Sequence, residues 1–266
     1  QQQAPAPADQ AHGFFYRTAR YVLLQGIFQV TNLCPSHQKV RSYALGRIEE
    51  YWPSFSTRTL SMKLYFAPRA CSLAPHIVLR ELGLPFSLIR VNNQTKRTAD
   101  GRDFYAVNPK GYVAALELAD GTVLTEGAAI LQYLADLRPE AGLAPANGTL
   151  QRTQLQAQLS FIGSELHAGM SPLFNEAIAE DAKVLLRQRL ARRLEYMEQV
   201  LAESGYAHGD HFTIADAYLF TVLGWTEHLR IDLTPFPATE RFRRRIAQRP
   251  CVIEAMRAEA QSAQVV

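Results

Sequence analysis

The sequence predicts two domains, a mixed α/β domain followed by an all-helical one. Three observations support this prediction. From Met62 to Leu137 the hydrophobic pattern alternates between strand and helix periods, whereas beyond residue 148 only the helical period remains. A Pro- and Gly-rich segment lies between the two regions. The chain has 266 residues, a length that accommodates two domains of ordinary size.

The α/β domain is predicted to begin with a strand, a helix and a second strand. Residues 63–66 and Phe86–Val91 are the strand candidates. Apolar residues at helical spacing predict a helix over Ser72–Leu82, which Gly83 can end and whose first turn accommodates Pro75. Two strands joined through a helix pair in parallel, with a right-handed crossover.

The second half of this domain predicts a hairpin and a helix. A polar stretch and a short helix near Gly101–Ala106 come first. The strand candidates Ala115–Leu118 and Thr122–Leu124 flank Asp120-Gly121, a dipeptide typical of hairpin turns. A helix over Gly127–Leu137 follows. We therefore expect a mixed four-stranded sheet with helices packed on it.

The second domain is predicted to be all-α and to follow a linker at residues 139–148. Two segments repeat apolar residues at helical spacing: Leu155, Leu159, Ile162 and Leu166, then Leu186, Leu190, Leu194, Met197 and Leu201. The run Ala217–Trp225 is apolar almost throughout, which predicts a helix buried on all sides. Thr213 and Asp216 have the spacing of a capping box, with Asp in place of Glu or Gln.

Residues 1–61 lie outside this pattern. Residues 1–13 are polar and rich in Ala and Pro, as disordered segments are, and residues 14–30 could form an amphipathic helix. Few acids occur there, which would also suit a transit peptide or a membrane-surface helix. Because a compact pattern begins abruptly at Met62, we interpret residues 1–61 as a poorly ordered or marginally helical extension, dispensable for folding and activity.

Composition excludes several classes of function. The net charge is +3, and from Met62 onward bases and acids balance, which gives no support to nucleic-acid binding. The basic run 241–245 is interpreted as a solvated helix face. No apolar run is long enough to span a membrane. Three cysteines, an odd number, argue against a disulfide framework and favour a reducing compartment such as the cytoplasm.

Cys71 is the most informative position, because it lies where a strand gives way to a helix. The helix dipole and nearby Arg69 are expected to lower the thiol pKa below the free value of about 8.5, which would make Cys71 a nucleophile. The alternative is a small buried side chain at a turn. No second cysteine follows in CxxC spacing, so any disulfide chemistry requires an external thiol.

Two other positions could bind a ligand. Glu126 and Gly127 occupy the second strand-to-helix junction, where Glu126 could hold an ammonium group and the helix N–H groups a carboxylate. The alternative is a simple helix-terminal charge. His167 ends an apolar stripe and could equally be a surface or interface histidine. The segment 208–211 contains two histidines but no third convergent ligand, so we interpret it as a turn and expect no metal.

The segment from Met62 to about Ala260 resembles the glutathione transferases of the bacterial beta class. The resemblance covers about three quarters of the chain and leaves out residues 1–61. Five motifs in the family's order and spacing carry it: MKLYFAPRACSLAPHIVLRELG, FYAVNPKGYVAAL, LTEGAAILQYLAD, SELHAGMSPLFN and FTIADAYLFTVLGW.

This resemblance implies a thioredoxin-like domain at residues 62–138, of order βαβαββα, an all-α domain at 149–262, and a homodimer. It implies glutathione as co-substrate and a small electrophile as second substrate. The glutathione sulfur would lie at Cys71, which can form a mixed disulfide with it, and His167 would approach that sulfur. The positions assigned to glutathione binding are Tyr65, Ser72, Lys96, Val113, Glu126, Gly127 and Ser160.

Within that set, the resemblance divides the tripeptide among named residues. Lys96 would meet the glycyl carboxylate, and Val113 would pair its backbone with the tripeptide as an added strand does. Glu126 and Gly127 would hold the γ-glutamyl end. Tyr65 matches a tyrosine near the site that is not the main partner of the sulfur.

Three positions depart from the family pattern. The family's Val-Pro, with its cis proline, is Val113-Ala114 here. A cis bond before a non-proline residue costs about 2.5–4 kcal/mol, so we expect this bond to be trans. An Asn seven residues before the histidine is Ser160, and the Lys after the histidine is Ala168. The helical-domain side of the site therefore matches less well than the first domain.

The function indicated is a glutathione transferase that conjugates glutathione to electrophiles, reduces mixed disulfides through Cys71, or both. The alternative is a non-catalytic protein of the same fold that binds glutathione or apolar ligands, which the weaker match of the helical domain supports. The motifs do not identify the electrophile.

Overall fold

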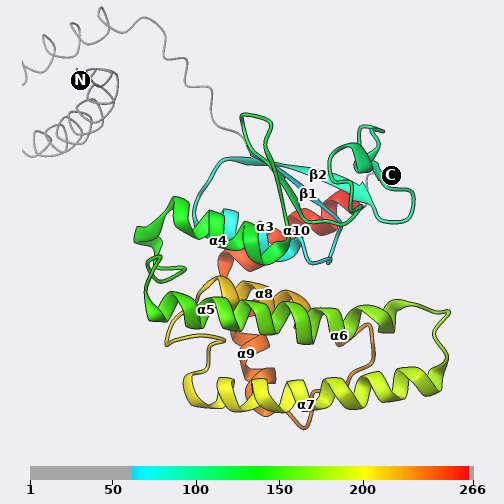
Figure 1. Ribbon diagram of the computed structural model, residues 1–266, viewed down its shortest axis with the longest axis vertical. Helices are drawn as coiled ribbons and strands as arrows, with labels where there is room; N and C mark the ends of the chain where they lie inside the picture. Colours follow the sequence, from blue (N-terminus) through cyan, green and yellow to red (C-terminus); the bar gives the residue numbers. More distant parts are fainter. Residues whose placement is uncertain (1–61, 264–266) are drawn as a thin grey trace, which may run out of the picture. The chain divides into compact units, whose positions relative to one another are not determined.

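The structure, a computed structural model, describes residues 62–263. Figure 1 shows that, within this range, a sheet with helices against it lies on one side and a group of longer helices on the other. The predicted amphipathic helix at residues 14–30 lies outside the described residues. Within them, no helix combines the length and the apolar composition that crossing a bilayer requires.

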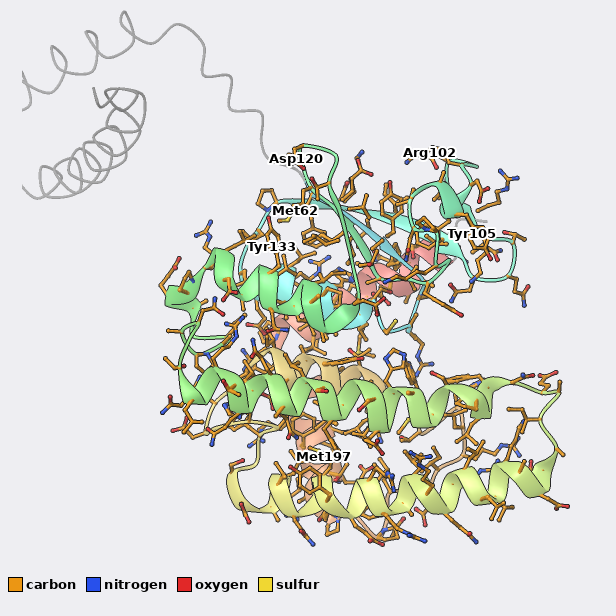
Figure 2. All side chains as sticks on the ribbon, viewed as in Figure 1. Met62, Arg102, Tyr105, Asp120, Tyr133 and Met197 are labelled. Atoms are coloured by element: carbon orange, nitrogen blue, oxygen red, sulfur yellow. The ribbon has the colours of Figure 1, made fainter. Side chains whose placement is uncertain are left out.

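The first domain contains a five-stranded mixed sheet of order β3-β2-β1-β4-β5. Its strands are β1 (Met62–Phe66), β2 (Phe86–Asn92), β3 (Arg97–Thr98), β4 (Ala115–Glu117) and β5 (Val123–Thr125). Strand β1 is parallel to β2 and antiparallel to β4, and the hairpin β4–β5 is antiparallel. The predicted mixed sheet is confirmed, and so is the hairpin turn at Asp120, which lies at the outer end of the hairpin in Figure 2.

The expected number of four strands is wrong. The fifth strand, β3, consists of two residues in the polar stretch and pairs antiparallel with β2. Two residues cannot show a period, so the hydrophobic pattern does not reveal it. The short helix predicted near Gly101–Ala106 is a 3₁₀ turn, η2 (Phe104–Ala106), and Asp103 caps it by accepting a hydrogen bond from the Tyr105 N–H at 3.0 Å.

The two helices predicted for this domain are both present. They are α3 (Leu73–Glu81) and α4 (Gly127–Leu137), which pack against each other and against a helix of the second domain. The apolar residues of α3 and α4 join those of the strands in one core cluster. This packing positions the N-terminal ends of both helices near the carboxyl ends of β1 and β5, where Cys71 and Glu126 lie.

The second domain is all-helical, as predicted. Its elements, after a short linker turn η3 (Pro139–Ala141), are α5 (Leu150–Phe161), a π-helical turn η4 (Ile162–His167), α6 (Ala168–Met170), η5 (Ser171–Phe174), α7 (Glu180–Ser204), α8 (Ile214–Leu223), α9 (Pro237–Ala247) and α10 (Pro250–Ala263). Every residue of α8 is buried, which confirms the prediction for that apolar run.

Asp216 fixes the start of α8. Its carboxylate accepts hydrogen bonds from the Thr213 N–H at 2.7 Å, the Thr213 hydroxyl at 2.9 Å and the Ala207 N–H at 2.8 Å. The reach back to Thr213 confirms the predicted capping-box contact despite the shorter Asp side chain. Burial raises the pKa of Asp216 to about 6, although these hydrogen bonds act in the opposite direction.

Glu259 of α10 joins the two domains. Its buried carboxylate accepts a hydrogen bond from the Arg69 N–H at 2.9 Å and lies 3.0 Å from His76 Nδ1. Arg80 Nε donates to His76 Nε2 at 2.9 Å, so Nδ1 carries a ring hydrogen and donates it to Glu259. Figure 1 shows α10 beside α3. The last helix therefore holds the loop that precedes Cys71.

Candidate functional site

Cys71 lies in the turn between β1 and α3, as the sequence predicts. Its Sγ donates a hydrogen bond to the Val113 carbonyl oxygen at 2.9 Å. Burial raises the pKa of the Cys71 thiol to about 11, and the backbone N–H groups of Ala114 and Ser72 only partly oppose this. Cys71 is therefore a protonated thiol at neutral pH.

The expectation of a lowered Cys71 pKa is wrong, for two physical reasons. The guanidinium of Arg69 points outward, with 73% of the side chain exposed, and lies 3.6 Å from the Glu227 carboxylate. It therefore supplies no nearby positive charge to the sulfur. In addition, burial penalises the thiolate more strongly than the N–H groups at the start of α3 stabilise it.

The expectation of a trans Val113-Ala114 bond is also wrong, because this peptide bond is cis. The expectation considered only the intrinsic preference of a non-proline bond, whereas both residues are buried in the fold and Ala114 directly precedes β4. Val113 presents its carbonyl to Cys71. Its predicted pairing with the tripeptide backbone stays a prediction.

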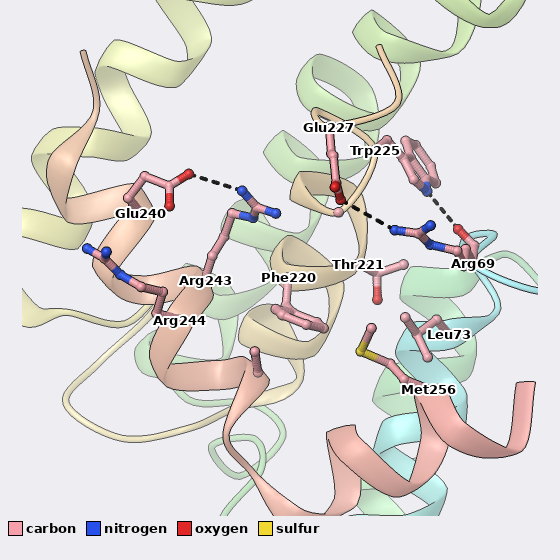
Figure 3. A pocket seen from close by; sticks show the side chains of 12 residues that line it. Arg69, Leu73, Phe220, Thr221, Trp225, Glu227, Glu240, Arg243, Arg244 and Met256 are labelled. Atoms are coloured by element: carbon pink, nitrogen blue, oxygen red, sulfur yellow. Dashed lines mark hydrogen bonds and ion pairs between the residues drawn. The ribbon is translucent and has the colours of Figure 1, made fainter. Parts of the chain in front are cut away.

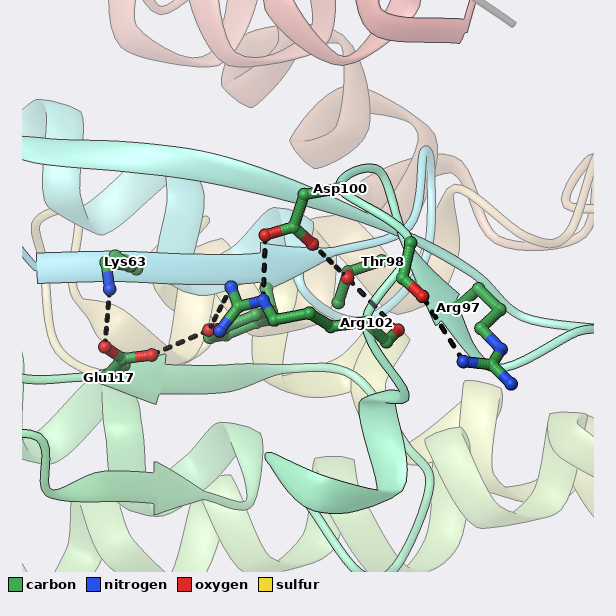
Figure 4. A network of polar contacts seen from close by, with 8 residues as sticks. Lys63, Arg97, Thr98, Asp100, Arg102 and Glu117 are labelled. Atoms are coloured by element: carbon green, nitrogen blue, oxygen red, sulfur yellow. Dashed lines mark hydrogen bonds and ion pairs between the residues drawn. The ribbon is translucent and has the colours of Figure 1, made fainter.

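The hydroxyls of Ser72 and Tyr65 have partners within the protein. Ser72 is buried, and its Oγ exchanges hydrogen bonds with the N–H and carbonyl of Ala67, both at 3.3 Å. Tyr65 is fully buried and donates to Glu117 at 2.6 Å, within the polar network of Figure 4. Lys63 contacts the same carboxylate at 2.6 Å. Tyr65 has no hydrogen bond to Cys71, so its assignment to glutathione rests on the resemblance alone.

His167 approaches from the helical domain, at the end of the π-helical turn η4. Its Nδ1 lies 2.8 Å from the Tyr218 hydroxyl oxygen, and its ring packs edge-on against Trp225 with centroids 4.8 Å apart. Burial lowers the pKa of His167, which the negative charge of Glu126 opposes. His167 is therefore a neutral imidazole at neutral pH.

Tyr218 links the two domains electrostatically and was not singled out in the sequence. Burial is the main cause that raises the pKa of the Tyr218 hydroxyl, and the negative charge of Glu126 acts in the same direction. Trp225 contacts the His167 ring, with centroids 4.8 Å apart, and donates to the Arg69 carbonyl at 2.9 Å. His167 and its partner Tyr218 therefore lie near the loop that leads to Cys71. The available signal was a phenol in the fully buried helix α8, because a buried hydroxyl requires a partner.

The predicted glycyl and γ-glutamyl ends of the site each contain a lysine. Lys96 Nζ donates to the Gly111 carbonyl at 2.9 Å and lies 5.7 Å from the Tyr112 ring centroid. Lys110 forms an ion pair with Glu126. A Cβ at Gly127 would meet no protein atom within 4 Å, so the start of α4 faces open space. These contacts leave the predicted glutathione roles of Lys96, Glu126 and Gly127 untested.

Ser160 is exposed in the last turn of α5. Its carbonyl accepts a hydrogen bond from Ser164 Oγ at 2.9 Å, and its own hydroxyl has no hydrogen bond among the described residues. The geometry therefore gives no additional support for Ser160 as a glutathione ligand, and that assignment stays a prediction.

The lining of a separate cavity of about 250 Å³ includes Arg69, Trp225 and Met256 (Figure 3). Neither Cys71 nor His167 lines it. The Trp225 indole N–H donates to the Arg69 carbonyl at 2.9 Å, which connects the helical domain to the loop that leads to Cys71. This hydrogen bond and the ring contact with His167 make Trp225 a second residue that the sequence interpretation missed.

No cluster of three or more His, Cys, Asp or Glu side chains within residues 62–263 could hold a metal ion. His211 instead contacts Asp210 at 2.8 Å and the Gly142 carbonyl at 3.1 Å.

Comparison with known proteins assigns both domains. Two family models match: glutathione S-transferase, N-terminal domain, over residues 69–137, and glutathione S-transferase, C-terminal domain, over residues 161–250. Glutathione S-transferase GstA of Escherichia coli O157:H7 is 45% identical over 198 residues, which cover 74% of this chain and 98% of that protein.

Two solved structures have the same fold over the same region. One is a bacterial beta class glutathione S-transferase of Sphingomonas chungbukensis, and the other is a sphingomonad glutathione S-transferase complexed with glutathione. Each is 44% identical, with a TM-score of 0.72, and the match covers 74% of this chain and 98% of the solved chain.

Proposed function

Because the chain belongs to the glutathione transferases, with the bacterial beta class among its neighbours, we propose that it conjugates glutathione to a small electrophile with the glutathione sulfur held between Cys71 and His167. Glutathione is the co-substrate, and the protein is a transferase. The glutathione-binding roles of Tyr65, Ser72, Lys96, Val113, Glu126, Gly127 and Ser160 are part of this proposal.

The observation that supports this mechanism is a protonated thiol on one domain and a neutral imidazole on the other. If His167 donates its Nδ1 hydrogen to the Tyr218 oxygen, its Nε2 lone pair can accept the proton of the glutathione thiol. The Cys71 S–H can then donate a hydrogen bond to the glutathione thiolate instead of to Val113. Both groups act from the protonation states that the site itself favours.

The reaction then balances without a further reactant. The thiolate forms a carbon–sulfur bond with the electrophile, and either a leaving group departs or the imidazolium returns its proton to the adduct. A Cys71 pKa of about 11 leaves little thiolate at neutral pH, so attack of Cys71 on disulfides is disfavoured. Conjugation is therefore the activity that this geometry favours.

Turnover of glutathione with an activated aryl chloride tests the proposal. His167→Ala should lower kcat by roughly 10²–10⁴-fold, the usual contribution of a general base, while glutathione still binds. His208→Ala is the matched control, because that histidine is also partly buried but lies outside the site. Glutathione binding without turnover in the wild-type protein would instead favour the non-catalytic carrier. Turnover only with mixed disulfides, abolished by Cys71→Ser, would favour reduction.

The same family membership supports further proposals about assembly, role and location. We propose a homodimer, a role in removing toxic electrophiles, and a cytoplasmic location, the last because Cys71 and Cys251 are both free thiols. Sedimentation equilibrium tests the dimer. The domain boundaries at 62–138, 139–148 and 149–262, with residues 1–61 as a dispensable extension, are also proposals, and limited proteolysis tests them.

A further inference from the structure

The carboxylate assigned to the ammonium of glutathione already contacts an ammonium of the protein. Lys110 Nζ pairs with Glu126 Oε1 and lies 3.3 Å from the Thr125 hydroxyl. The two charged side chains are 53% and 67% exposed. Exposed pairs of this kind add little to stability and open readily, so stability does not account for this contact at the mouth of the site.

The backbone that carries Lys110 is held firmly, although its ammonium is exposed. Asn108 is buried, and its side chain donates to the Tyr112 carbonyl at 2.7 Å and accepts from the Lys110 N–H at 3.2 Å. Lys96 donates to the Gly111 carbonyl of the same loop. A fixed Cα with a flexible four-carbon side chain lets the ammonium move by a few ångströms without any movement of the loop.

The γ-glutamyl end of glutathione carries an ammonium and a carboxylate on one carbon. Its ammonium suits Glu126, but Lys110 competes for the same oxygens. Its carboxylate suits the N-terminal end of α4 beside Gly127, where space is open. Two ammonium groups at one carboxylate repel each other, unless Lys110 shifts to the carboxylate that the ligand brings.

We propose that Lys110 is a specificity-determining residue that selects the α-amino acid end of glutathione. On binding, the Lys110 ammonium exchanges Glu126 for the γ-glutamyl carboxylate, and Glu126 accepts the ligand ammonium. The four charges then alternate in sign. This inference rests on the proposed function, because that function assigns Glu126 to glutathione.

The exchange predicts opposite effects for two truncated ligands. A glutathione analogue without the α-carboxylate must displace Lys110 and offers it nothing in return, so removal of Lys110 should help it bind. An analogue without the α-ammonium brings a carboxylate beside Glu126, and Lys110 is needed to neutralise the two. Removal of Lys110 should therefore weaken the binding of this second analogue, and also that of glutathione itself.

Calorimetric titration of the full chain with these three ligands tests the inference. In Lys110→Gln, glutathione and the analogue without the ammonium should each bind about fivefold more weakly, the order expected for one exposed charge pair. The analogue without the carboxylate should bind about fivefold more tightly. Lys110→Arg, which keeps the charge, should restore the wild-type order. In turnover, Lys110→Gln should raise KM for glutathione and leave kcat unchanged.

Lys63→Gln is the matched control. Lys63 also belongs to the first domain and pairs with a glutamate, Glu117, at 2.6 Å, but this pair lies in the separate network of Figure 4. It should leave all three affinities unchanged. A shift of all three ligands in the same direction in Lys110→Gln would overturn this inference alone, since it would indicate a general effect of charge. Failure of the wild-type protein to bind glutathione would overturn the proposed function as well.

Discussion

The candidate site has two walls, one from each domain, and they consist of different kinds of groups. On the first-domain side, the neighbours of Cys71 are main-chain atoms, chiefly the Val113 carbonyl and the Ala114 N–H. On the helical-domain side the candidate site consists of side chains, the rings of His167 and Tyr218. Main-chain groups persist through most substitutions, whereas a ring is lost with its residue. Function should therefore depend on backbone anchors in one wall and on individual side chains in the other.

Each wall has a buried carboxylate as its anchor. Glu259 holds the Arg69 N–H in the loop before Cys71, and Asp216 holds the start of the helix that carries Tyr218. They differ in their surroundings. Glu259 has a histidine partner on the other domain, whereas Asp216 accepts only from its own domain.

Removal of the first anchor should have the largest effect. Glu259→Ala leaves two donors, the Arg69 N–H and the buried His76 Nδ1, without an acceptor, and should lower the free energy of unfolding by about 4 kcal/mol. Urea denaturation measures this change. Glu254→Ala, on the same helix but with an exposed ion pair to Arg80, should change stability by less than about 1 kcal/mol. Equal effects of the two substitutions would contradict the role of Glu259 as an anchor.

Removal of the second anchor should cost less. Asp216→Ala leaves the Ala207 and Thr213 N–H groups without acceptors but also relieves the burial of a carboxylate, so we expect a loss of about 3 kcal/mol. Thermal unfolding measures it, with Asp210→Ala as a control because that side chain is 97% exposed. A loss below about 1 kcal/mol would show that helix packing alone fixes α8.

Tyr218→Phe tests whether activity depends on an individual side chain of the helical-domain wall. His167 loses the partner of its Nδ1 and its preferred orientation, so kcat should fall about tenfold while stability changes little. The pH profile gives a second measurement. His167 must be neutral to act as a base, so activity should fall as the pH drops through its lowered pKa, below the ordinary value. Unchanged kcat in Tyr218→Phe would remove this phenol from the mechanism.

The smallest expected effect is a pH dependence of stability that comes from Cys71. Its folded pKa of about 11 lies above that of an unfolded thiol, so its contribution is complete below pH about 8.5 and is lost as the pH rises toward 11. Between pH 7 and pH 9 the loss should be less than about 1 kcal/mol. Denaturation of wild type and Cys71→Ala over this range measures the difference. Alkylation of Cys71 with a midpoint near the free-thiol value would contradict the raised pKa.

Sequence periodicity predicted α8 well because burial on all sides leaves a nearly continuous apolar run, Ala217–Trp225, that few other structures produce. The positions of Cys71 and Glu126 were also predictable, since each lies between a strand and the helix that follows it. The ionisation of Cys71 was not, because it depends on the direction in which Arg69 points and on how deeply the sulfur is buried. Neither property has a local sequence signal.

The helical-domain wall was only half predictable, for a related reason. His167 stood out through the resemblance of its motif, whereas Tyr218 lies in an apolar run where a tyrosine looks like one more core residue. Its importance comes from a contact with a histidine 51 residues earlier in the chain. Tertiary contacts of this separation leave no periodic pattern in a single sequence.

The bond from Glu259 to the Arg69 N–H spans 190 residues of sequence. During synthesis on a ribosome, the whole first domain emerges long before the helix that completes its sulfur loop. While the helical domain is being translated, the Arg69 N–H in this loop has no Glu259 carboxylate to donate to. A chain made only as far as the first domain therefore lacks the carboxylate that holds the Arg69 N–H. The order of synthesis thus delays the final geometry of this loop until α10 has been made.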